Sequence, residues 1–329
     1  MRVAVFGAGA MGAVHAAAWA RIHDVDLAAV VGRSPSRARE LAARFAVPAF
    51  TDPAPLLDDD SIDAVDLTVP TALHRDLAIA ALERGKHVLC ETPLAPSVPD
   101  VDAMIEAAHR AGRILQVAQL VRLAQPNVEV RDLVRTGALG RPLVVSCERL
   151  WPGRDALDDP HDHHGDALDE VALFDLDWLL WCFGLPDAIA AHASAISGAR
   201  VDHVLVVLEI GGVRAFVEAS LRLPASFPFR LATRVVCEDD TVEWSVRFAA
   251  AGPPEVIVSR HPRWGAAETR SPHGPDPYLT ECQHFARVVR GEADPGLLDP
   301  AGARDGLRIV AAARASLAGG GARVPLRVV

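Results

Sequence analysis

The strongest constraint on this chain lies in its first twelve residues. The apolar run 3–6 is typical of a short buried strand, and a G-x-G-x-x-G pattern follows it at once. Gly7 permits a tight turn, Gly9 lets the backbone approach a pyrophosphate, and Gly12 lets the next helix pack on the strand. The run 13–21 continues as that helix, whose free amides would face the phosphates. Rather than a purely structural glycine turn, the pattern predicts a dinucleotide site formed by Gly7, Ala8, Gly9, Ala10, Met11 and Gly12.

Composition limits the class of protein. At 329 residues, half of them hydrophobic, the chain is long enough for two domains with buried cores. A net charge of −10 argues against nucleic acid as a partner, and no apolar run approaches the ~20 residues that span a bilayer. A strand starting at residue 2 leaves no room for a signal peptide, and five scattered cysteines without C-x-x-C indicate free thiols. We therefore expect a cytoplasmic protein that binds neither nucleic acid nor a membrane.

Strand and helix patterns alternate along residues 1–122, which we interpret as a dinucleotide-binding Rossmann domain. Further strands are expected at 26–31, 64–69, 87–90 and 114–118, and helices at 36–45, 72–84 and 98–111. This order implies a doubly wound parallel sheet, which binds ligands at the carboxyl ends of its strands. The candidate cofactor-binding residues therefore follow the strands: Arg33, Ser34, Thr68, Pro70, His74, Glu91, Thr92 and Gln119.

The pattern changes after about residue 123, and we assign 123–329 to a second, α+β domain. Helices are expected at 128–136, 168–183, 278–290 and 301–317, and a polar loop at 151–165. Strand-like runs occur at 143–150, 189–196, 204–210, 215–221, 230–237, 241–248 and 255–259. Short turn signals between them indicate a mostly antiparallel sheet, so the expected fold class is α/β with a Rossmann sheet followed by this domain.

The end of the second strand decides the cofactor. An Asp or Glu about 20 residues after the glycine motif usually holds the ribose 2′-OH of NAD. That count reaches Gly32, and Arg33, Ser34 and Arg37 follow it. An acid would repel a 2′-phosphate, whereas a guanidinium binds one through two parallel hydrogen bonds. The sequence therefore favours NADP; the alternative is NAD bound without its usual acid, with both arginines as surface charges.

Several further segments resemble those of the Gfo/Idh/MocA oxidoreductase family, in one order over nearly the whole chain. They are G-A-G-A-M-G-A-V-H at 7–15, T-V-P-T-A-L-H at 68–74, G-K-H-V-L-C-E-T-P-L-A at 85–95, T-G-A-L-G-R-P at 136–142 and G-D-A-L-D-E-V-A-L-F-D-L-D at 165–177. The resemblance implies hydride transfer between a nicotinamide and a sugar, cyclitol or related carbonyl. It also implies a small-molecule substrate and a homodimer or homotetramer formed through an open C-terminal sheet.

The chain departs from this family at its catalytic positions. Thr92 stands where the family has the lysine of E-K-P, Phe174 where it has the histidine of D-x-x-x-H, and Gln119 where many members have histidine. Phenylalanine cannot exchange a proton and threonine offers only a neutral hydrogen bond, so the usual dehydrogenase mechanism is altered. Glu170 keeps a carboxylate at the family's Asp position and is the first candidate acid/base, the alternative being a helix-start carboxylate.

A histidine-rich loop at 161–166 supplies another candidate. By family position it borders the substrate pocket, which makes His164 a candidate catalytic residue. Its histidines and acids suit a divalent ion, but their spacing matches no established metal motif, and we assign no metal. His15 and His74 match the family frame as supports of the fold or of the cofactor cleft.

Three functions follow from these residues. The first is an NADPH-dependent oxidoreductase of a small C=N or C=O substrate, since an iminium ion arrives already protonated and needs less help from an enzyme acid. The second is a non-redox enzyme, such as a cyclase, lyase or hydrolase, that keeps the fold and uses Glu170 and the histidine-rich loop. The third is a non-catalytic binding or sensor protein. Abundant Ala and Arg with almost no Lys indicate a GC-rich bacterial genome, and divergent family members often belong to secondary metabolism.

Overall fold

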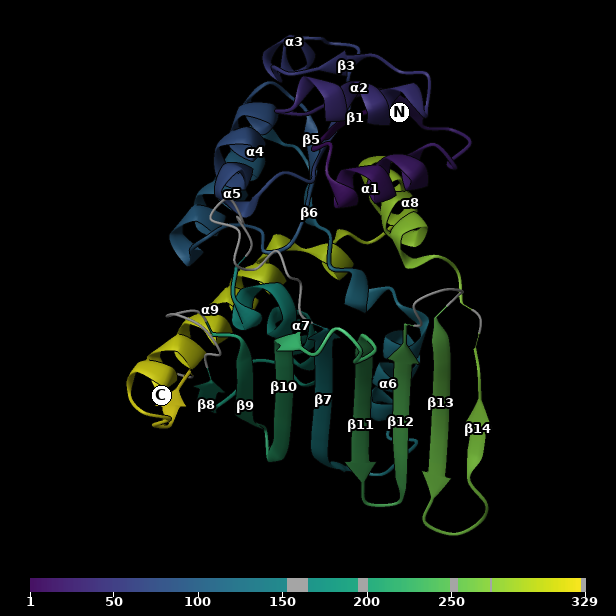
Figure 1. The fold of residues 1–329 in the computed structure, drawn as a ribbon, viewed down its shortest axis with the longest axis vertical. Helices are drawn as coiled ribbons and strands as arrows, with labels where there is room; N and C mark the ends of the chain where they lie inside the picture. Colours follow the sequence, from purple (N-terminus) through teal and green to yellow (C-terminus); the bar gives the residue numbers. More distant parts are fainter. Residues whose placement is uncertain (153–164, 195–200, 249–253, 273, 327–329) are drawn as a thin grey trace. The chain divides into compact units, whose positions relative to one another are not determined.

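The computed structural model describes residues 1–152, 165–194, 201–248, 254–272 and 274–326. Two units divide the chain: Met1–Leu123 with Pro275–Arg304, and Ala124–Gly274 with Asp305–Val329. The late helix α8 (Pro277–Val289) contacts α1 (Ala10–Trp19), and the two lie side by side in Figure 1. Residues 275–304 thus pack with the first unit, although they follow the strands of the second unit in the sequence.

A six-stranded parallel sheet forms the centre of the first unit, in the order β3-β2-β1-β4-β5-β6. Its strands are β1 (Arg2–Phe6), β2 (Asp26–Val31), β3 (Ala49–Phe50), β4 (Ala64–Leu67), β5 (His87–Cys90) and β6 (Leu115–Val117). This is the Rossmann strand order, in which the direction of strand addition reverses beside β1 and ligands bind at the carboxyl edge. The doubly wound parallel sheet expected from the sequence is confirmed.

The helices of this unit begin and end at the residue types that favour helix ends. Besides α1 and α8 they are α2 (Pro35–Ala43), α3 (Ala54–Leu57), α4 (His74–Glu83) and α5 (Val98–Ala111), with short 3₁₀ turns η1 (Thr71–Leu73), η2 (Leu120–Arg122) and η5 (Pro295–Leu298). Ser34 caps α2 ahead of a proline, and Ser97 caps α5 in the same way. Gly112 ends α5 in the left-handed conformation, with φ +61°.

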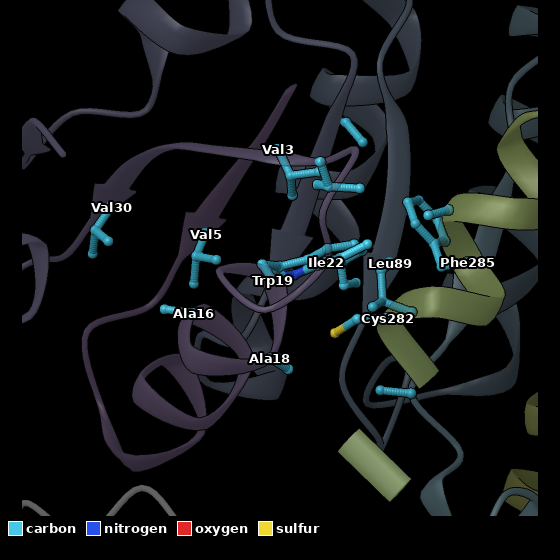
Figure 2. Close-up of a cluster of buried hydrophobic side chains, with 14 of the residues drawn as sticks. Val3, Val5, Ala16, Ala18, Trp19, Ile22, Val30, Leu89, Cys282 and Phe285 are labelled. Carbon is cyan, nitrogen blue, oxygen red and sulfur yellow. The ribbon is translucent and has the colours of Figure 1, made fainter. Parts of the chain in front are cut away.

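A cluster of buried apolar side chains holds α1 and α8 to the sheet (Figure 2). Trp19 of α1 and Phe285 of α8 are fully buried and meet edge to face, with ring centroids 6.1 Å apart. Val3 and Val5 of β1 and Leu89 of β5 belong to the same cluster. Each buried aromatic ring removes about 150–250 Å² from water, so this contact explains why a late segment completes the first unit.

A nine-stranded sheet forms the second unit, in the order β14-β13-β12-β11-β7-β10-β9-β8-β15. Its strands are β7 (Pro142–Pro152), β8 (Ala188–Ser194), β9 (His203–Ile210), β10 (Val213–Leu223), β11 (Arg230–Cys237), β12 (Asp240–Arg247), β13 (Glu255–Pro262), β14 (Glu268–Arg270) and β15 (Val324–Pro325). Neighbouring strands run antiparallel except β7 and β10, which are parallel. The mostly antiparallel sheet expected from the sequence is confirmed.

Helices cover one face of this sheet. They include α6 (Gln125–Arg135), which contacts β12, and α7 (Leu173–Phe183), which contacts β7 and β10. The expected helix at 168–183 begins as a single π-helical segment, η4 (Leu168–Ala172), and the long helix α9 (Pro300–Ala318) lies mainly in this unit. Among the helices of the described residues, none is both long and apolar enough to cross a membrane.

The opposite face of the sheet exposes apolar side chains. Side chains alternate between the two faces of a strand, and Val145, Val206 and Val217 point toward the buried face. The residue before each of them points to the other face: Val144, Leu205 and Phe216 are 37%, 47% and 44% exposed. We call the face that carries these three residues the open sheet face.

Candidate functional site

Two of the three glycines of the G-x-G-x-x-G pattern have no room for a side chain. Gly7 has φ +141°, and a Cβ there would lie 2.2 Å from Oγ1 of Thr68. A Cβ at Gly12 would lie 2.0 Å from the carbonyl oxygen of Gly7. At Gly9, in contrast, no atom of the described residues lies within 4 Å of a Cβ. Two glycines therefore pack strand against helix, and the third leaves the approach to the turn open.

The start of α1 is suited to an anion. Gly9 is its N-cap and provides no side-chain hydrogen bond, and the first turn contains no acid. The leading N–H groups of an α-helix have no acceptor within the helix, and the helix dipole adds partial positive charge there. Such an end binds phosphate groups directly through its backbone.

A cavity of about 290 Å³ lies beside this turn, against α2. It is lined by Ala8, Gly9, Ala10, Ala13, Arg37, Glu40, Leu41 and Arg44. Sequence reasoning identified Arg37 but missed Glu40 and Arg44. Residues three, four and seven positions apart share one face of a helix, so the spacing from Arg37 is the signal that finds the other two.

The loop after β2 is electropositive and cannot take an acid at its first position. A Cβ at Gly32 would lie 2.6 Å from the Cβ of Ala8. Ser34 accepts a hydrogen bond from the N–H of Arg37 at 3.5 Å and so caps α2, whose N-terminus adds positive charge. The side chains of Arg33 and Arg37 are exposed, and within the described chain neither guanidinium forms an ion pair. These groups fit a phosphate better than a ribose hydroxyl.

Three other predicted residues lie at the same carboxyl edge, because β1, β4, β5 and β6 are parallel neighbours. Thr68 follows β4 and donates its hydroxyl to the carbonyl of Phe6 at 3.2 Å. Glu91 follows β5 directly, and Gln119 lies buried just beyond β6. Pro70, at the start of η1, is exposed.

A buried histidine connects four segments of the first unit. Nδ1 of His15 in α1 lies 2.8 Å from Oδ2 of Asp66 in β4, and Trp19 donates its indole N–H to that same oxygen at 2.6 Å. Nε2 of His15 lies 3.1 Å from Oε1 of Glu91, an ion-pair distance without full hydrogen-bond alignment. Nε2 is also 3.9 Å from Oε2 of Glu281 in α8. We call His15, Asp66, Glu91 and Glu281 the histidine–acid cluster.

The charge of this cluster follows from its surroundings. Burial disfavours an imidazolium, but the charges and polar contacts of Asp66 and Glu91 outweigh it and raise the pKa of His15 well above 6.5. Burial, together with the charges of Glu91 and Asp66, raises the pKa of Glu281 well above 4.5 and favours its protonated form. The buried imidazole of His15 therefore lies against Asp66 and Glu91, of which Glu91 is 15% exposed to solvent.

His15, Asp66 and Cys282 also bring three potential metal-ligand atoms within 4.8 Å of one another. Burial and the charge of Asp66 raise the pKa of the Cys282 thiol well above 9.0, whereas a metal binds the thiolate. Nδ1 of His15 and the indole of Trp19 already occupy one oxygen of Asp66. His15, Trp19 and Asp66 form a hydrogen-bonded core. Sequence reasoning expected His15 to support the fold or the cofactor cleft but missed its partner Asp66, for which an acid inside the apolar strand 64–69 was the available signal.

The E-T-P segment, Glu91-Thr92-Pro93, is held at both ends. Glu91 approaches His15 with one carboxylate oxygen and with the other accepts the N–H of Thr92 at 3.1 Å. His74, buried at the start of α4, lies 3.0 Å through Nδ1 from the carbonyl of Pro93. Its Nε2 lies 2.8 Å from the carbonyl of Val69. Both ring nitrogens of His74 thus face backbone carbonyls.

Glu170 lies in η4 of the second unit. Its Oε1 accepts the backbone N–H of Gly165 at 2.9 Å, which ties the carboxylate to the segment before the helix. The neighbouring acids Asp166 and Asp169 both bind Arg314 of α9, at 2.8 and 2.6 Å. The contact between Glu170 and the N–H of Gly165 is the kind expected of a carboxylate at a helix start. The other candidate from this region, His164, lies outside the described residues, as does the rest of 161–164.

An ion pair underlies Phe174. Arg149 of β7 donates to both oxygens of Asp175, at 3.1 and 3.0 Å, in a pair that is nearly buried. The guanidinium carbon of Arg149 lies 5.0 Å from the centre of the Phe174 ring. An arginine above an aromatic face is attracted by the ring electrons. At this position the chain therefore has an aromatic ring packed on a two-point ion pair, and the ring itself cannot exchange a proton.

Two family models match the chain. One, described as the oxidoreductase family with an NAD-binding Rossmann fold, matches residues 1–119. The other, the GFO/IDH/MocA C-terminal domain, matches residues 127–243. The first match spans the glycine turn and the E-T-P segment, and the second spans Glu170 and Phe174.

Known proteins are similar over most or all of the chain. Inositol 2-dehydrogenase 4 of Saccharopolyspora erythraea is 30% identical over 342 residues, covering 100% of this chain and 96% of the relative. D-xylose 1-dehydrogenase (NADP(+)) 2 of Haloferax volcanii is 29% identical over 276 residues, covering 82% and 83%. The crystal structure of an aldose-aldose oxidoreductase from Caulobacter crescentus has a TM-score of 0.86 at 22% identity over 99% of both chains, a likeness of fold.

The protonation state of His15 predicts how stability changes with pH. Because its pKa is raised in the folded protein, His15 contributes its full stabilisation below its unfolded pKa of 6.5 and loses it as pH rises toward the raised value. In urea unfolding from pH 6 to 9, the free-energy advantage of the native protein over His15→Gln should shrink, by up to about 1.4 kcal/mol per pH unit.

The half-buried His87 provides the control for this measurement. Burial lowers its pKa below 6.5, so its contribution is lost only as pH falls. The free-energy difference between the native protein and His87→Gln should stay constant above pH 7. A His15→Gln difference that is equally constant would contradict a charged His15.

Proposed function

The chain belongs to the Gfo/Idh/MocA oxidoreductase family, and we propose that it is an NADPH-dependent reductase of a small C=N or C=O substrate. The observation that carries the proposal is the glycine turn at the start of α1, which we call the cradle. Gly7 and Gly12 bring strand and helix into backbone contact, and Gly9 leaves the helix amides accessible. In this proposal residues 1–122 bind the dinucleotide, and residues 123–329 supply the substrate-binding and oligomerisation domain, apart from 275–304, which pack with the first unit.

The loop after β2 supports NADP over NAD. Gly32 excludes the acid that would hold a ribose 2′-OH and would repel a 2′-phosphate. Arg33, Arg37 and the capped N-terminus of α2 supply positive charge at that place. One similar dehydrogenase, from Haloferax volcanii, carries NADP(+) in its name.

The proposed chemistry needs little proton transfer from the protein. Bound NADPH would supply a hydride to the substrate carbon. Thr92, at the family's lysine position, would hold the substrate through a neutral hydroxyl, and Phe174, at the family's histidine position, would exchange no proton with it. Glu170 would supply a proton where the substrate does not already carry one. An iminium substrate fits this set of residues better than a ketone, because its nitrogen is protonated before hydride arrives.

Cofactor choice can be tested on the two arginines. Changing both Arg33 and Arg37 to Ala should weaken NADPH binding by roughly tenfold or more, since a hydrogen bond to a charged group contributes about 1.5–3 kcal/mol. NADH affinity should change little, because NADH lacks the 2′-phosphate. Fluorescence titration of both cofactors measures the effect.

Arg39→Ala is the matched control, since Arg39 is exposed on the same helix but does not line the cavity. Its NADPH affinity should equal that of the native protein. Equal losses of NADPH and NADH affinity in the double variant would refute the proposed role of Arg33 and Arg37.

Turnover can be tested with a panel of cyclic imines and ketones, following NADPH absorbance and product together. In Glu170→Gln, ketone reduction should fall by roughly 10²-fold or more, a usual contribution of one general acid, while reduction of a preformed iminium should fall much less. Asp169→Asn, which alters a neighbouring carboxylate bound to Arg314, is the control. Product without NADPH loss would establish the non-redox alternative, and binding without any turnover would contradict an enzyme.

The open sheet face supports the proposal of a homodimer or homotetramer. Its exposed side chains Val144, Leu205 and Phe216 form an apolar surface of the kind that contacts a second copy. Changing Leu205 and Phe216 together to Glu should convert the oligomer to monomers in sedimentation experiments. Leu73→Glu, at an exposed apolar residue of the first unit, should leave the assembly intact. A native protein that sediments as a monomer would overturn the proposal.

A further inference from the structure

We infer that His15 and His74 are positioning residues that fix the E-T-P segment, and with it the backbone of Thr92. The inference rests on the proposed function in one respect, which is the placement of Thr92 beside the cofactor. Neither histidine is proposed to touch a substrate. Each acts through a neighbour, His15 through the Glu91 side chain and His74 through the Pro93 carbonyl.

His15 acts from the interior of the sheet. Its Nδ1 is fixed on Asp66, whose same oxygen also binds the Trp19 indole, so the ring has one orientation. Nε2 then lies 3.1 Å from Oε1 of Glu91, at ion-pair distance. The second oxygen of Glu91 accepts the N–H of Thr92, which passes the constraint from the buried imidazolium to the backbone. This sequence of contacts runs from β4 through α1 to the end of β5.

His74 acts from the other end of the segment. Its ring lies between the carbonyls of Val69 and Pro93, at 2.8 and 3.0 Å. Burial lowers its pKa, so the neutral ring has a single N–H and donates to one of the two carbonyls at a time. The buried ring therefore lies between the loop after β4 and the E-T-P segment, and it holds the Pro93 carbonyl when Nδ1 carries the proton.

Thr92, at the centre of the segment, is the reason why the backbone of the E-T-P segment must be held firmly. A lysine, as in the family pattern, carries its amine on a flexible four-carbon stem that can adjust to a misplaced backbone. The hydroxyl of Thr92 sits on Cβ, so its position is set almost entirely by the backbone and one rotamer. Because a short side chain cannot compensate, any reaction that uses Thr92 depends on how firmly Glu91 and Pro93 are held.

Amide hydrogen exchange in the cofactor-free protein tests the inference directly. The Thr92 amide should exchange about tenfold or more faster in His15→Gln, relative to the amide of Val88, whose bond to Ile114 in the sheet reports unfolding of the whole unit. His74→Gln should have the same effect on this ratio. His109→Gln, which alters an exposed histidine in the last turn of α5, should leave the ratio unchanged.

A second variant separates positioning from loss of stability. Glu91→Gln keeps the shape of the side chain, lies partly in solvent, and should reproduce the change in the Thr92-to-Val88 ratio. The double variant His15→Gln/Glu91→Gln should add nothing beyond either single change, because both break the same link. An unchanged ratio in His15→Gln, or strictly additive effects of the two changes, would overturn the inference for His15.

Cofactor binding then distinguishes this inference from the proposed function. NADPH affinity should fall less than threefold in His15→Gln and His74→Gln, since the glycine turn carries the phosphates, while the emission of the bound nicotinamide should move toward that of free NADPH. If the native protein fails to bind NADPH, the proposed function is wrong, and the exchange ratio still decides whether the histidines hold Thr92. Unaltered nicotinamide emission in both variants would contradict their placement of Thr92 at the cofactor.

Discussion

Backbone contact at Gly7 and Gly12 is the constraint on which the first unit depends. Because neither position has space for a Cβ, β1, α1 and the residue after β4 approach more closely than side chains would allow. That approach has two consequences on opposite sides of α1. It sets the helix N-terminus at the carboxyl edge of the sheet, where amides face a ligand. It also places His15, one turn further along α1, against the sheet, where the His15 ring contacts Asp66 of β4. The cradle and the histidine–acid cluster therefore have one steric cause.

The sequence predicted the regular elements well, because periodicity and glycine placement are local. The strands at 26–31 and 87–90 and the helix at 98–111 have the expected bounds. It missed β3, β14 and β15, each only two or three residues long, since so short a run has no period. It also could not find the cluster, whose members come from α1, β4, α8 and the end of β5. Such a contact is decided by packing, and only the acid within an apolar strand hinted at it.

The two units differ in where their titratable groups lie. In the first unit Thr92 replaces the lysine of E-K-P, so Glu91 is the charged residue left in that segment. Its carboxylate contacts His15 and accepts the N–H of Thr92. In the second unit Phe174 replaces an imidazole and packs on an arginine whose charge Asp175 neutralises. Charge near both altered positions is thus used to hold structure. This distribution favours a reaction in which the substrate brings its own proton, and leaves Glu170 as the group whose role distinguishes a ketone from an iminium.

The histidine–acid cluster is costly to bury, and this cost indicates what it does. Removing two carboxylates and an imidazolium from water costs several kcal/mol per ion, and their attraction offsets that cost only where the geometry is good. Apolar residues of equal volume would often give a core at least as stable. An apolar side chain, however, has no charge with which to hold Glu91, whereas an imidazole fixed on Asp66 keeps its second nitrogen 3.1 Å from that carboxylate. The cluster therefore places Glu91 as well as contributing to stability, and through Glu91 it holds the E-T-P segment.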